Sequence, residues 1–458
     1  MTTARPEPEH GADVVALSRA QTAPDLTIST LGPARIDSPL GHLLDHRSTS
    51  EHYVDENDLV LFDDTVAGIA SRGGTLADLP GMEPCGPRRK IFFDPAKTRA
   101  AIVTCGGLCP GLNDVIAGLV RTLTYHYRVR RVVGIRNGYQ GFVPSYGHDV
   151  VDLTPESVRD IATDGGTVLG TSRGHQDADE IVDCLERLHV NVLFVVGGDG
   201  SMRGAMRIAR TVAERGLYIS VVGIPKTIDN DIPYIDQSFG FQTAFSHASD
   251  AIRAARVEAT STANGIGLVK LMGRHSGFIA CYAALARSGA DVELIPEVPF
   301  GLDGEGGLLA HLRRRVEERG HAVVVVAEGA GQDLLGTADG HDASGNSRLQ
   351  DIGPYLRRRI GDHFADAGIE TSIRYIDPSY AIRSVPANPY DSVYCVRLSQ
   401  AAVHAAMSGR TEMVVGRYRR RFVHVPMAAA VSRRNQVDPH GDLWTAVLES
   451  TGQPIRFG

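Results

Sequence analysis

The chain has 458 residues, which is too many for a single hydrophobic core, so two or three domains are expected. Its formal net charge of −7 argues against a nucleic-acid-binding surface, although a local cluster of Arg and Lys can still bind a small anion. No apolar run reaches the roughly 18 residues of a membrane-spanning helix, and residues 1–10 lack the apolar stretch of a signal peptide. We therefore expect a cytoplasmic protein with neither a membrane nor a nucleic acid as partner.

The cysteine pattern agrees with a reducing compartment. Six cysteines are scattered, mostly through apolar segments. Cys105 and Cys109 bracket a glycine turn at a spacing that a metal site could use, but no second Cys/His pair follows, so a zinc site is not expected. We interpret all six as reduced residues of the protein core.

The N-terminal part has a weak pattern. Residues 1–44 are rich in Pro, Ala and Thr with little periodicity, which is typical of a mobile tail. Short strands are predicted over Tyr53–Phe62 and Arg88–Phe93, around a glycine-rich loop. The sequence does not reveal the function of this part.

The first buried strand is predicted at Arg99–Thr104, and it leads into a glycine turn and a helix. Asn113 is a suitable cap for that helix. Gly106 and Gly107 could bring backbone N–H groups close to an anion, as other strand-to-helix phosphate sites do. The turn therefore predicts a phosphate-binding site.

Two further polar turns follow apolar strands. Val192–Val196 has no polar residue, which is typical of a strand buried on both faces, and it ends in Gly-Gly-Asp-Gly-Ser, where Ser201 is a plausible helix cap. The next strand, Tyr218–Ile224, ends in Lys226 to Asp231. Ligands of open α/β sheets lie at such strand ends, so both turns are candidate site segments.

The second half of the chain repeats the arrangement. A helix is predicted to about Thr260, a strand at Gly265–Met272 leads to Arg274, and a strand at Val323–Ala327 leads to Glu328. Arg173 lies in a separate glycine-rich loop. By itself it is either a solvated charge or a planar donor for a phosphoryl group.

In combination, these motifs resemble the 6-phosphofructokinase family over about residues 86–431. The phrases at Gly107–Asn113, Leu271–Arg274 and Tyr375–Tyr380 resemble its long-chain branch from plants and trypanosomatids. The resemblance implies an α/β fold with two Rossmann-like doubly wound lobes and an N-terminal extension. We expect the extension at 1–95, a nucleotide-binding lobe at 96–238 plus about 384–435, and a sugar-phosphate-binding lobe at 239–383 plus about 436–458.

The implied activity is the glycolytic transfer of phosphate from ATP to D-fructose 6-phosphate, giving D-fructose 1,6-bisphosphate, with Mg²⁺ as metal and a homodimer or homotetramer as assembly. Two alternatives remain open at this point. One is a pyrophosphate-dependent phosphofructokinase, and the other is a non-catalytic subunit that binds sugar phosphate or nucleotide. Gly200 favours ATP, because pyrophosphate enzymes of the family carry a second Asp there, whereas Lys226 is typical of those pyrophosphate enzymes. We give Gly200 more weight, because an added carboxylate would exclude ATP by volume and by charge.

The resemblance also implies site residues. Asp229 is the expected base, with Thr227, Arg173 and Lys226 around the transferred phosphoryl group, and Asp199 is the expected Mg²⁺ ligand. The expected nucleotide contacts are Gly107, Tyr139, Arg173, Gly174, Gly198, Asp199, Gly200 and Ser201. The expected sugar-phosphate contacts are Thr227, Ile228, Asp229, Met272, Gly273, Arg274, Glu328, Arg374, Tyr380, Ala381, Ile382 and Arg383.

Two positions depart from the common bacterial pattern. Tyr380 stands where the bacterial enzymes have histidine, and a phenol adds no positive charge, so the pocket should depend more on Arg374 and Arg383. Gly265 stands near the place of an additional arginine that bacterial enzymes donate across a subunit interface.

Overall fold

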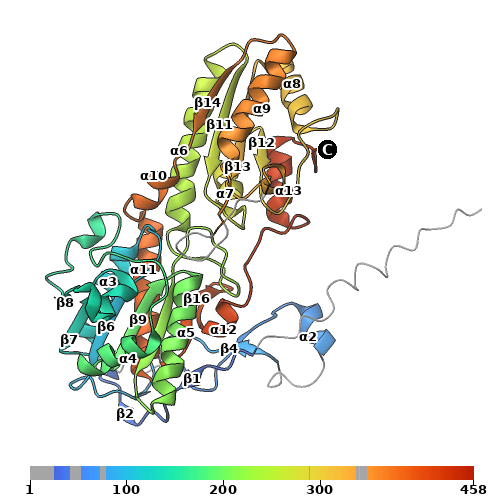
Figure 1. Ribbon diagram of the computed structural model, residues 1–458. Coiled ribbons are helices and arrows are strands. Elements are labelled where there is room, and N and C mark those ends of the chain that lie inside the picture. The colour runs from blue at the N-terminus through green and yellow to red at the C-terminus, as the bar shows by residue number, and fades with distance from the viewer. Residues whose placement is uncertain (1–24, 42–52, 73–78, 288, 337–339, 341–347) are drawn as a thin grey trace, which may run out of the picture.

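The computed structural model describes residues 25–41, 53–72, 79–287, 289–336, 340 and 348–458. Most of the tail predicted over residues 1–44 therefore lies outside the described residues. Two β-sheets, one above the other in Figure 1, form the centres of two lobes. The C-terminal part of the chain contributes to both lobes, because α11 and β16 lie in the lower one and α13 lies in the upper one.

The lower lobe contains a seven-stranded mixed sheet in the order β17-β16-β10-β9-β6-β7-β8. The five central strands, β16 to β7 in this order, pair in parallel with their neighbours. The edge strand β17 is antiparallel to β16, and the edge strand β8 is antiparallel to β7. The strands are β6 (Arg99–Thr104), β7 (Arg131–Ile135), β8 (Val150–Leu153), β9 (Val192–Gly197), β10 (Ser220–Pro225), β16 (Met413–Tyr418) and β17 (Arg421–Pro426). The helices around it are α3 (Leu112–Arg121), α4 (Ala178–Arg187), α5 (Asp199–Glu214), α11 (Pro389–Met407) and α12 (Met427–Ala430).

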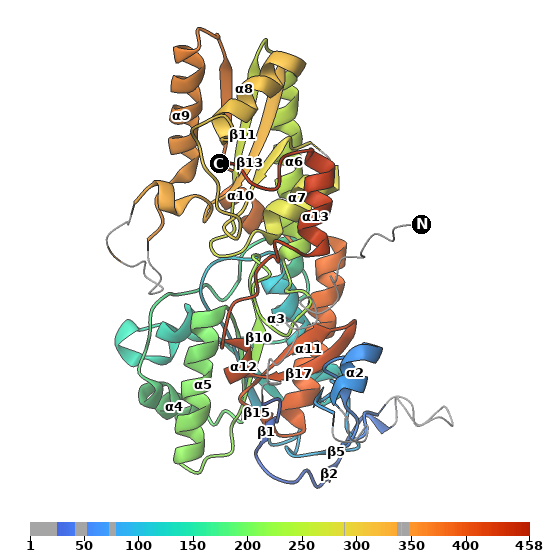
Figure 2. The ribbon, with the colours of Figure 1, turned by 90° about the vertical axis from the view of Figure 1, so that its right-hand side faces the viewer.

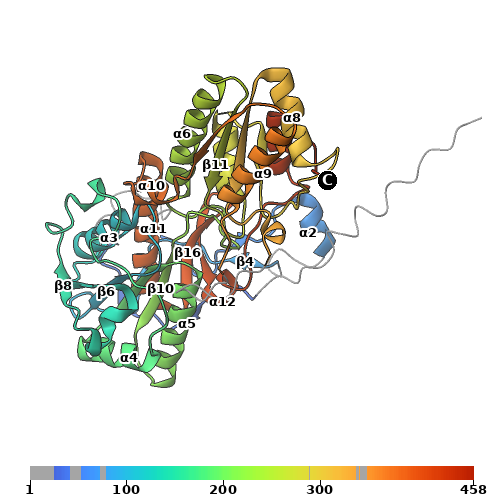
Figure 3. The same ribbon diagram turned by 45° about the horizontal axis from the view of Figure 1, so that its top comes forward.

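The upper lobe contains a four-stranded sheet in the order β12-β13-β11-β14, and all of its neighbours pair in parallel. Its strands are β11 (Gly265–Leu271), β12 (Val292–Leu294), β13 (His321–Ala327) and β14 (Ser372–Ile376). Its helices are α6 (Phe241–Thr260), α7 (Phe278–Arg287), α8 (Leu308–Arg319), α9 (Ile352–Asp366) and α13 (Asp442–Thr451), and the short α10 (Ser379–Ser384) lies between the lobes (Figure 3).

Both sheets are covered on both faces, as a doubly wound fold requires. In β9 the side chain of Phe194 packs in the core with residues of α3 and α11, while Leu193 and Val195 pack in a second core with residues of α4 and α5. In the upper lobe, α6 and α7 cover one face, and α8 and α9 cover the other. The predicted α/β class and its two doubly wound lobes are confirmed. The exact lobe boundaries stay a prediction, although each sheet takes its strands from one predicted lobe.

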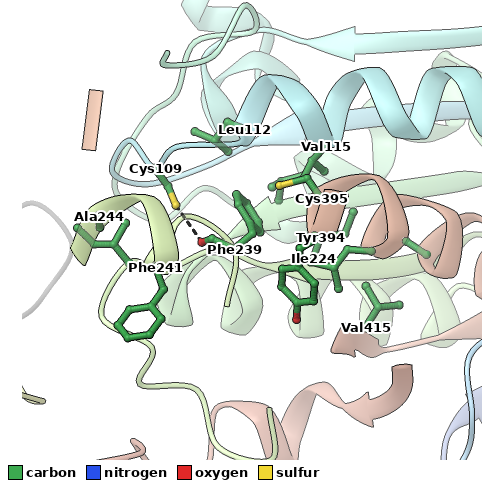
Figure 4. Close-up of a cluster of buried hydrophobic side chains, with 14 of the residues drawn as sticks. Cys109, Leu112, Val115, Ile224, Phe239, Phe241, Ala244, Tyr394, Cys395 and Val415 are labelled. Atoms are coloured by element: carbon green, nitrogen blue, oxygen red, sulfur yellow. Dashed lines mark hydrogen bonds between the residues drawn. The ribbon is translucent and has the colours of Figure 1, made fainter. Parts of the chain in front are cut away.

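The two lobes share a continuous hydrophobic core where the chain passes from one to the other. Figure 4 shows Phe239 packed among Cys109, Leu112 and Cys395, with the Cys109 thiol donating to the carbonyl of Phe239 at 3.2 Å. All six cysteines are free, and five of them are buried, which agrees with their predicted role in the core. This packing fixes the first glycine turn against the start of α6.

The described part of the N-terminal extension adds short strands and helix α2 beside the lower lobe (Figure 2). These elements are β1 (Ser29–Thr30), β2 (Ile36–Asp37), β3 (Val60–Leu61), α2 (Val66–Arg72), β4 (Gly81–Met82) and β5 (Lys90–Ile91), and β1 pairs with β15 (Arg410–Thr411). A group of charged side chains joins the extension to the lobe. Glu83 accepts hydrogen bonds from Arg88 at 2.9 Å and from Arg410, and it lies 3.2 Å from His424 Nδ1. The extension is therefore fixed to the lobe by a buried charge cluster.

Two predicted helix caps are wrong. Helix α3 begins at Leu112 with Gly111 as its cap, and Asn113 lies inside the first turn, where its side chain binds the backbone of Asp164 and Val168. Helix α5 begins at Asp199, so Gly198 takes the cap position and Ser201 lies within the first turn. In both cases glycine provides the entry to the helix, and the polar side chain is left free for contacts outside it.

Candidate active site

The glycine turn after β6 faces two arginines from distant parts of the chain. A methyl group built on Gly107 would lie 3.7 Å from Arg173 Nη2 and 3.9 Å from Arg383 Nη1. Gly174, next to Arg173, has a φ of +96°, a conformation that glycine adopts without strain. The bare backbone of Gly107 thus lies close to two positive charges, which is an arrangement suited to an anion.

Lys226 and Ser201 complete this turn on the side of β10. A methyl group on Gly106 would lie 3.6 Å from Lys226 Nζ and 3.9 Å from Ser201 Oγ. Lys226 Nζ donates to the carbonyl of Gly107 at 2.6 Å, and its burial lowers the pKa of the ammonium group. The lysine therefore ties the turn after β6 to the turn after β10.

The first turn of α5 presents the segment predicted to face the nucleotide. Asp199 is partly exposed, and one of its carboxylate oxygens lies 3.3 Å from Arg203 Nε on the same helix. Gly200 is exposed, and a methyl group built on it would meet no atom within 4 Å. A carboxylate and an open backbone therefore lie together at the helix N-terminus, where the helix dipole favours anions.

The turn after β10 contains an ordered chain of polar contacts. Thr227 Oγ1 accepts from the backbone N–H of Asp229 at 3.1 Å and donates to Asp231 Oδ1 at 3.1 Å. Ser276 Oγ, from the upper lobe, donates to the carbonyl of Asp229 at 3.0 Å. Ile228 lies between them with its side chain in the core. These contacts hold the carboxylate of Asp229 in one place at the junction of the lobes.

The Asp229 carboxyl group is the most perturbed acid of the site. Its Oδ1 is buried and accepts no hydrogen bond from any residue that the structure describes. Burial, together with the nearby charges of Asp231 and Glu328, raises the pKa of Asp229 to about 8. A buried acid with a free oxygen and a pKa near neutrality has the properties of a general base.

The ends of β11 and β13 form the upper side of the site. Gly273 has a φ of +130°, and its carbonyl accepts from the backbone of Gly329 at 3.2 Å, so the turn at 272–274, which begins with Met272, packs on the turn that begins with Glu328. Burial raises the pKa of Glu328, and the charges of Lys270 and Arg274 oppose this rise. Arg274 and Glu328 thus lie near each other on this side of the site.

Helix α10 brings Arg383 to the turn of Gly107, as described above. The guanidinium of Arg383 lies over the ring of Tyr380, 4.8 Å from its centre, while Tyr380 is 77% exposed. Ala381 is exposed, and Ile382 is buried in the shared core. This helix therefore offers Arg383 and Tyr380 to a ligand, and it uses Ile382 as its anchor.

Two predicted site residues lie apart from this group. Arg374 pairs in register with Gly267, well before the end of β11, and its exposed side chain contacts Glu258 of α6 at 3.4 Å. Tyr139 is buried, packs against Gly204, and donates to the carbonyl of Ser201 at 2.7 Å. Its ring packs against α5 from the core side. The ring therefore has no exposed face that could contact a nucleotide.

Sequence reasoning missed Arg434, a residue of the segment between α12 and α13. Its Nη1 lies 3.2 Å from Asp231 Oδ2, and its Nη2 lies 3.9 Å from Asp199 Oδ2. Arg434 and Asp231 are 203 residues apart in the chain, and no spacing rule links them. The only available signal was a pair of adjacent arginines after a buried segment, which is also typical of a protein surface.

The donor set fits a magnesium ion in part. Two carboxylates, Asp199 and Asp231, lie around the guanidinium of Arg434, and Asp199 also contacts Arg203, so hard oxygen ligands are present. No group of three or more His, Cys, Asp or Glu side chains that could hold a metal exists among the described residues. Mg²⁺ usually keeps several waters and binds through one or two carboxylates plus substrate phosphates, so this sparse set suits it.

Comparisons with known proteins identify similar sequences over most of the chain. The family model described as Phosphofructokinase matches residues 99–406. The chain is 59% identical over 441 residues to an ATP-dependent 6-phosphofructokinase from Amycolatopsis methanolica, covering 95% of this chain and 96% of that protein. It is 47% identical over 372 residues to an ATP-dependent 6-phosphofructokinase from Trypanosoma cruzi, covering 81% and 76%.

Solved structures show the same fold at low identity. A pyrophosphate-dependent phosphofructokinase from Marinobacter aquaeolei matches with a TM-score of 0.64 at 20% identity, covering 79% of this chain and 92% of that chain. A phosphofructokinase from Pichia pastoris in the T-state matches with a TM-score of 0.60 at 23% identity, covering 78% and 37%. At these identities the likeness concerns the fold alone.

Proposed function

The chain belongs to the phosphofructokinase family, and we propose that the polar turns at the junction of its two lobes form the active site of an ATP-dependent 6-phosphofructokinase. The enzyme is a phosphotransferase that carries out a glycolytic reaction, the phosphorylation of fructose 6-phosphate with ATP as donor. The residue roles that follow are part of the proposal. The observation that carries them is the buried Asp229 carboxylate, held at a strand end with one oxygen free.

Asp229 takes the proton of the sugar 1-hydroxyl as that oxygen attacks the γ-phosphorus of ATP, while the bond from this phosphorus to the β,γ-bridging oxygen breaks and ADP leaves. The free Oδ1 is the acceptor, and the contacts from Thr227 and Ser276 keep the carboxylate turn in place. Because the pKa of Asp229 is raised, its carboxylate is a stronger base than that of an ordinary Asp. Thr227, next to the base, contacts the transferred group through its hydroxyl.

Arg173 and Lys226 stabilise the charge that develops on the transferred phosphoryl group. Arg173 lies beside the backbone of Gly107 and Lys226 lies beside that of Gly106, each in van der Waals range of a methyl group built there. Phosphoryl transfer depends mainly on positioning and on such positive donors, because the charge is spread over three oxygens. These two cations at one turn therefore provide the main electrostatic contribution of the protein.

The nucleotide lies along the glycine turns and the start of α5, with Gly107, Gly174, Gly198, Gly200 and Ser201 as its neighbours. Asp199 is the residue that would hold Mg²⁺, and the ion, when bound, neutralises charge on the donor phosphates. The open space around Gly200 leaves room for the α-phosphate of ATP. This agrees with ATP rather than pyrophosphate as the donor.

Fructose 6-phosphate binds on the upper side of the junction. Arg274 and Arg383 hold its phosphate, Glu328 accepts from its hydroxyls, and the backbone of Met272 and Gly273 lines the sugar. Carboxylate and guanidinium groups are the usual partners of hydroxyl and phosphate groups respectively. The backbone of Ile228 and the α10 segment from Tyr380 to Ile382 close the remaining sides.

Arg374 lies too far along β14 to join this group within one chain. Its exposed position on a sheet edge makes it available to a second copy, and this supports a homodimer or homotetramer. We also place the enzyme in the cytoplasm, because its six cysteines are free. No helix in the described part of the chain is both long and apolar enough to cross a bilayer.

A turnover assay tests the proposal directly. The purified protein is offered fructose 6-phosphate with ATP or with pyrophosphate in parallel, and formation of fructose 1,6-bisphosphate is followed. We expect turnover with ATP and little or none with pyrophosphate. Faster turnover with pyrophosphate would favour a pyrophosphate-dependent enzyme, and binding of both substrates without turnover would favour a regulatory subunit.

A further inference from the structure

The segment Val431–Val437, here called the strap, connects α12 of the lower lobe to α13 of the upper lobe (Figures 1 and 2). It passes directly beside the turns described above. Arg203 Nη2 donates to the carbonyl of Val431 at 2.8 Å at one end, and the backbone N–H of Val437 donates to Glu297 at 2.9 Å at the other. The strap is therefore held by both lobes.

The middle of the strap contacts two turns of the site, one containing Asp231 and the other containing Arg274. The backbone N–H of Asn435 donates to the carbonyl of Asp231 at 2.7 Å. Gln436 Nε2 donates to the carbonyl of His275 at 3.0 Å, in the turn that presents Arg274. These two contacts fix the position of the residue between Arg433 and Asn435, which is Arg434.

Arg434 places one guanidinium between two carboxylates. It binds Asp231 at 3.2 Å and lies 3.9 Å from Asp199, and its own side chain is only 33% exposed. Two carboxylates that approach one position repel each other, and a partly desolvated cation between them offsets this repulsion. Because Arg is always charged, this countercharge is permanent.

We propose that Arg434 is a positioning residue whose guanidinium pairs with the carboxylates of Asp199 and Asp231, which the catalytic metal ion would also use. It thereby weakens metal binding, and it fixes the turn of Asp231. This inference rests on the proposed function and deepens it. The guanidinium competes with a divalent cation for Asp199. Through Asp231 it also holds Thr227, whose hydroxyl contacts both Asp231 and the backbone of Asp229.

This arrangement predicts two effects of opposite sign when Arg434 is replaced by Met. Loss of the competing charge should tighten binding of a divalent cation, by about fivefold once solvent screening at this partly exposed site is allowed for. Loss of the contact to Asp231 should lower kcat by about tenfold or more, because the turn of Thr227 is no longer held. Damage to the fold would lower both binding and turnover.

The test measures Mn²⁺ binding by electron paramagnetic resonance, with no nucleotide present and therefore no turnover. Arg434→Met is compared with the parent, with Arg434→Lys and with Arg433→Met. The last is a matched control, since the guanidinium of Arg433 lies over the ring of Tyr234 at 5.3 Å. Asp199→Asn shows which part of the signal comes from this site, and kcat is measured separately with ATP and fructose 6-phosphate.

Tighter Mn²⁺ binding with a lower kcat in Arg434→Met, and near-parent values of both in Arg434→Lys and Arg433→Met, is the expected result. Unchanged or weaker Mn²⁺ binding in Arg434→Met overturns the inference, and so does an unchanged kcat. If the parent itself does not turn over, the proposed function fails, and the Mn²⁺ comparison still decides whether Arg434 competes for Asp199.

Discussion

Replacing Gly200 by Asp tests how the start of α5 selects the phosphoryl donor. Gly200 is exposed, has no positive φ, and would carry a side chain without meeting any atom within 4 Å. An acidic residue in the first turn of a helix is also favourable for the helix dipole. The variant should therefore fold as the parent does, so that a change in activity reports on ligand binding.

The expected effect on ATP follows from the added charge. A carboxylate about 5 Å from a phosphate oxygen costs about 3 kcal/mol at an effective dielectric constant of about 20, and exposure to solvent reduces this to about 1–2 kcal/mol. The Asp side chain also occupies space that the nucleotide would use. From both effects we expect kcat/KM for ATP to fall by about 10- to 100-fold, since 1.4 kcal/mol is a factor of ten.

The assay varies ATP at saturating fructose 6-phosphate in the parent, Gly200→Asp and Gly200→Ala. Since Ala adds volume without charge, it should remain much closer to the parent. If Gly200→Asp keeps its kcat/KM for ATP within about threefold of the Ala variant, where the charge alone predicts about tenfold, the electrostatic argument for donor choice is wrong.

Two further predictions concern pH. Burial alone would raise the pKa of Glu83, but its hydrogen bonds with His424 and Arg410 lower the pKa to about 2. The cluster should therefore contribute about 2–3 kcal/mol of stability above pH 4.5, and this contribution should be lost as the pH falls toward 2. Glu83→Gln should flatten the free energy of unfolding across that window, and an unchanged slope would contradict this. Because the pKa of Asp229 is raised to about 8, kcat/KM should fall about tenfold per pH unit below that value, as the base becomes protonated. A flat profile between about pH 6 and pH 8 would exclude Asp229 as the titrating base.

The sequence predicted the strand ends well, because a buried parallel strand followed by a polar glycine turn is a local pattern. The turns at Gly107, Asp199, Asp229 and Glu328 all follow buried strands, as expected. Their approach to one another follows from the rule that ligands of α/β sheets lie at the carboxyl ends of strands. The family resemblance then predicted the chemistry.

The errors arose where tertiary contacts override local preference. Ser201 and Asn113 are good caps by type, but glycine takes the cap position in both helices, and the Asn113 side chain binds the backbone of Asp164 and Val168 instead. The family resemblance implied a nucleotide contact for Tyr139, whereas its ring is buried and its hydroxyl donates to the carbonyl of Ser201 in α5. Arg434 could not be found from the sequence, because only the fold brings the strap to Asp231.

The most direct test of the account is the turnover of Asp229→Asn, in which the side chain keeps its shape and loses its basic oxygen. Fructose 6-phosphate affinity, measured by calorimetry, should stay near that of the parent, while kcat falls by roughly 10²- to 10⁴-fold, the usual contribution of a general base. A kcat within about threefold of the parent would show that another group accepts the proton, and the mechanism built on Asp229 would be wrong.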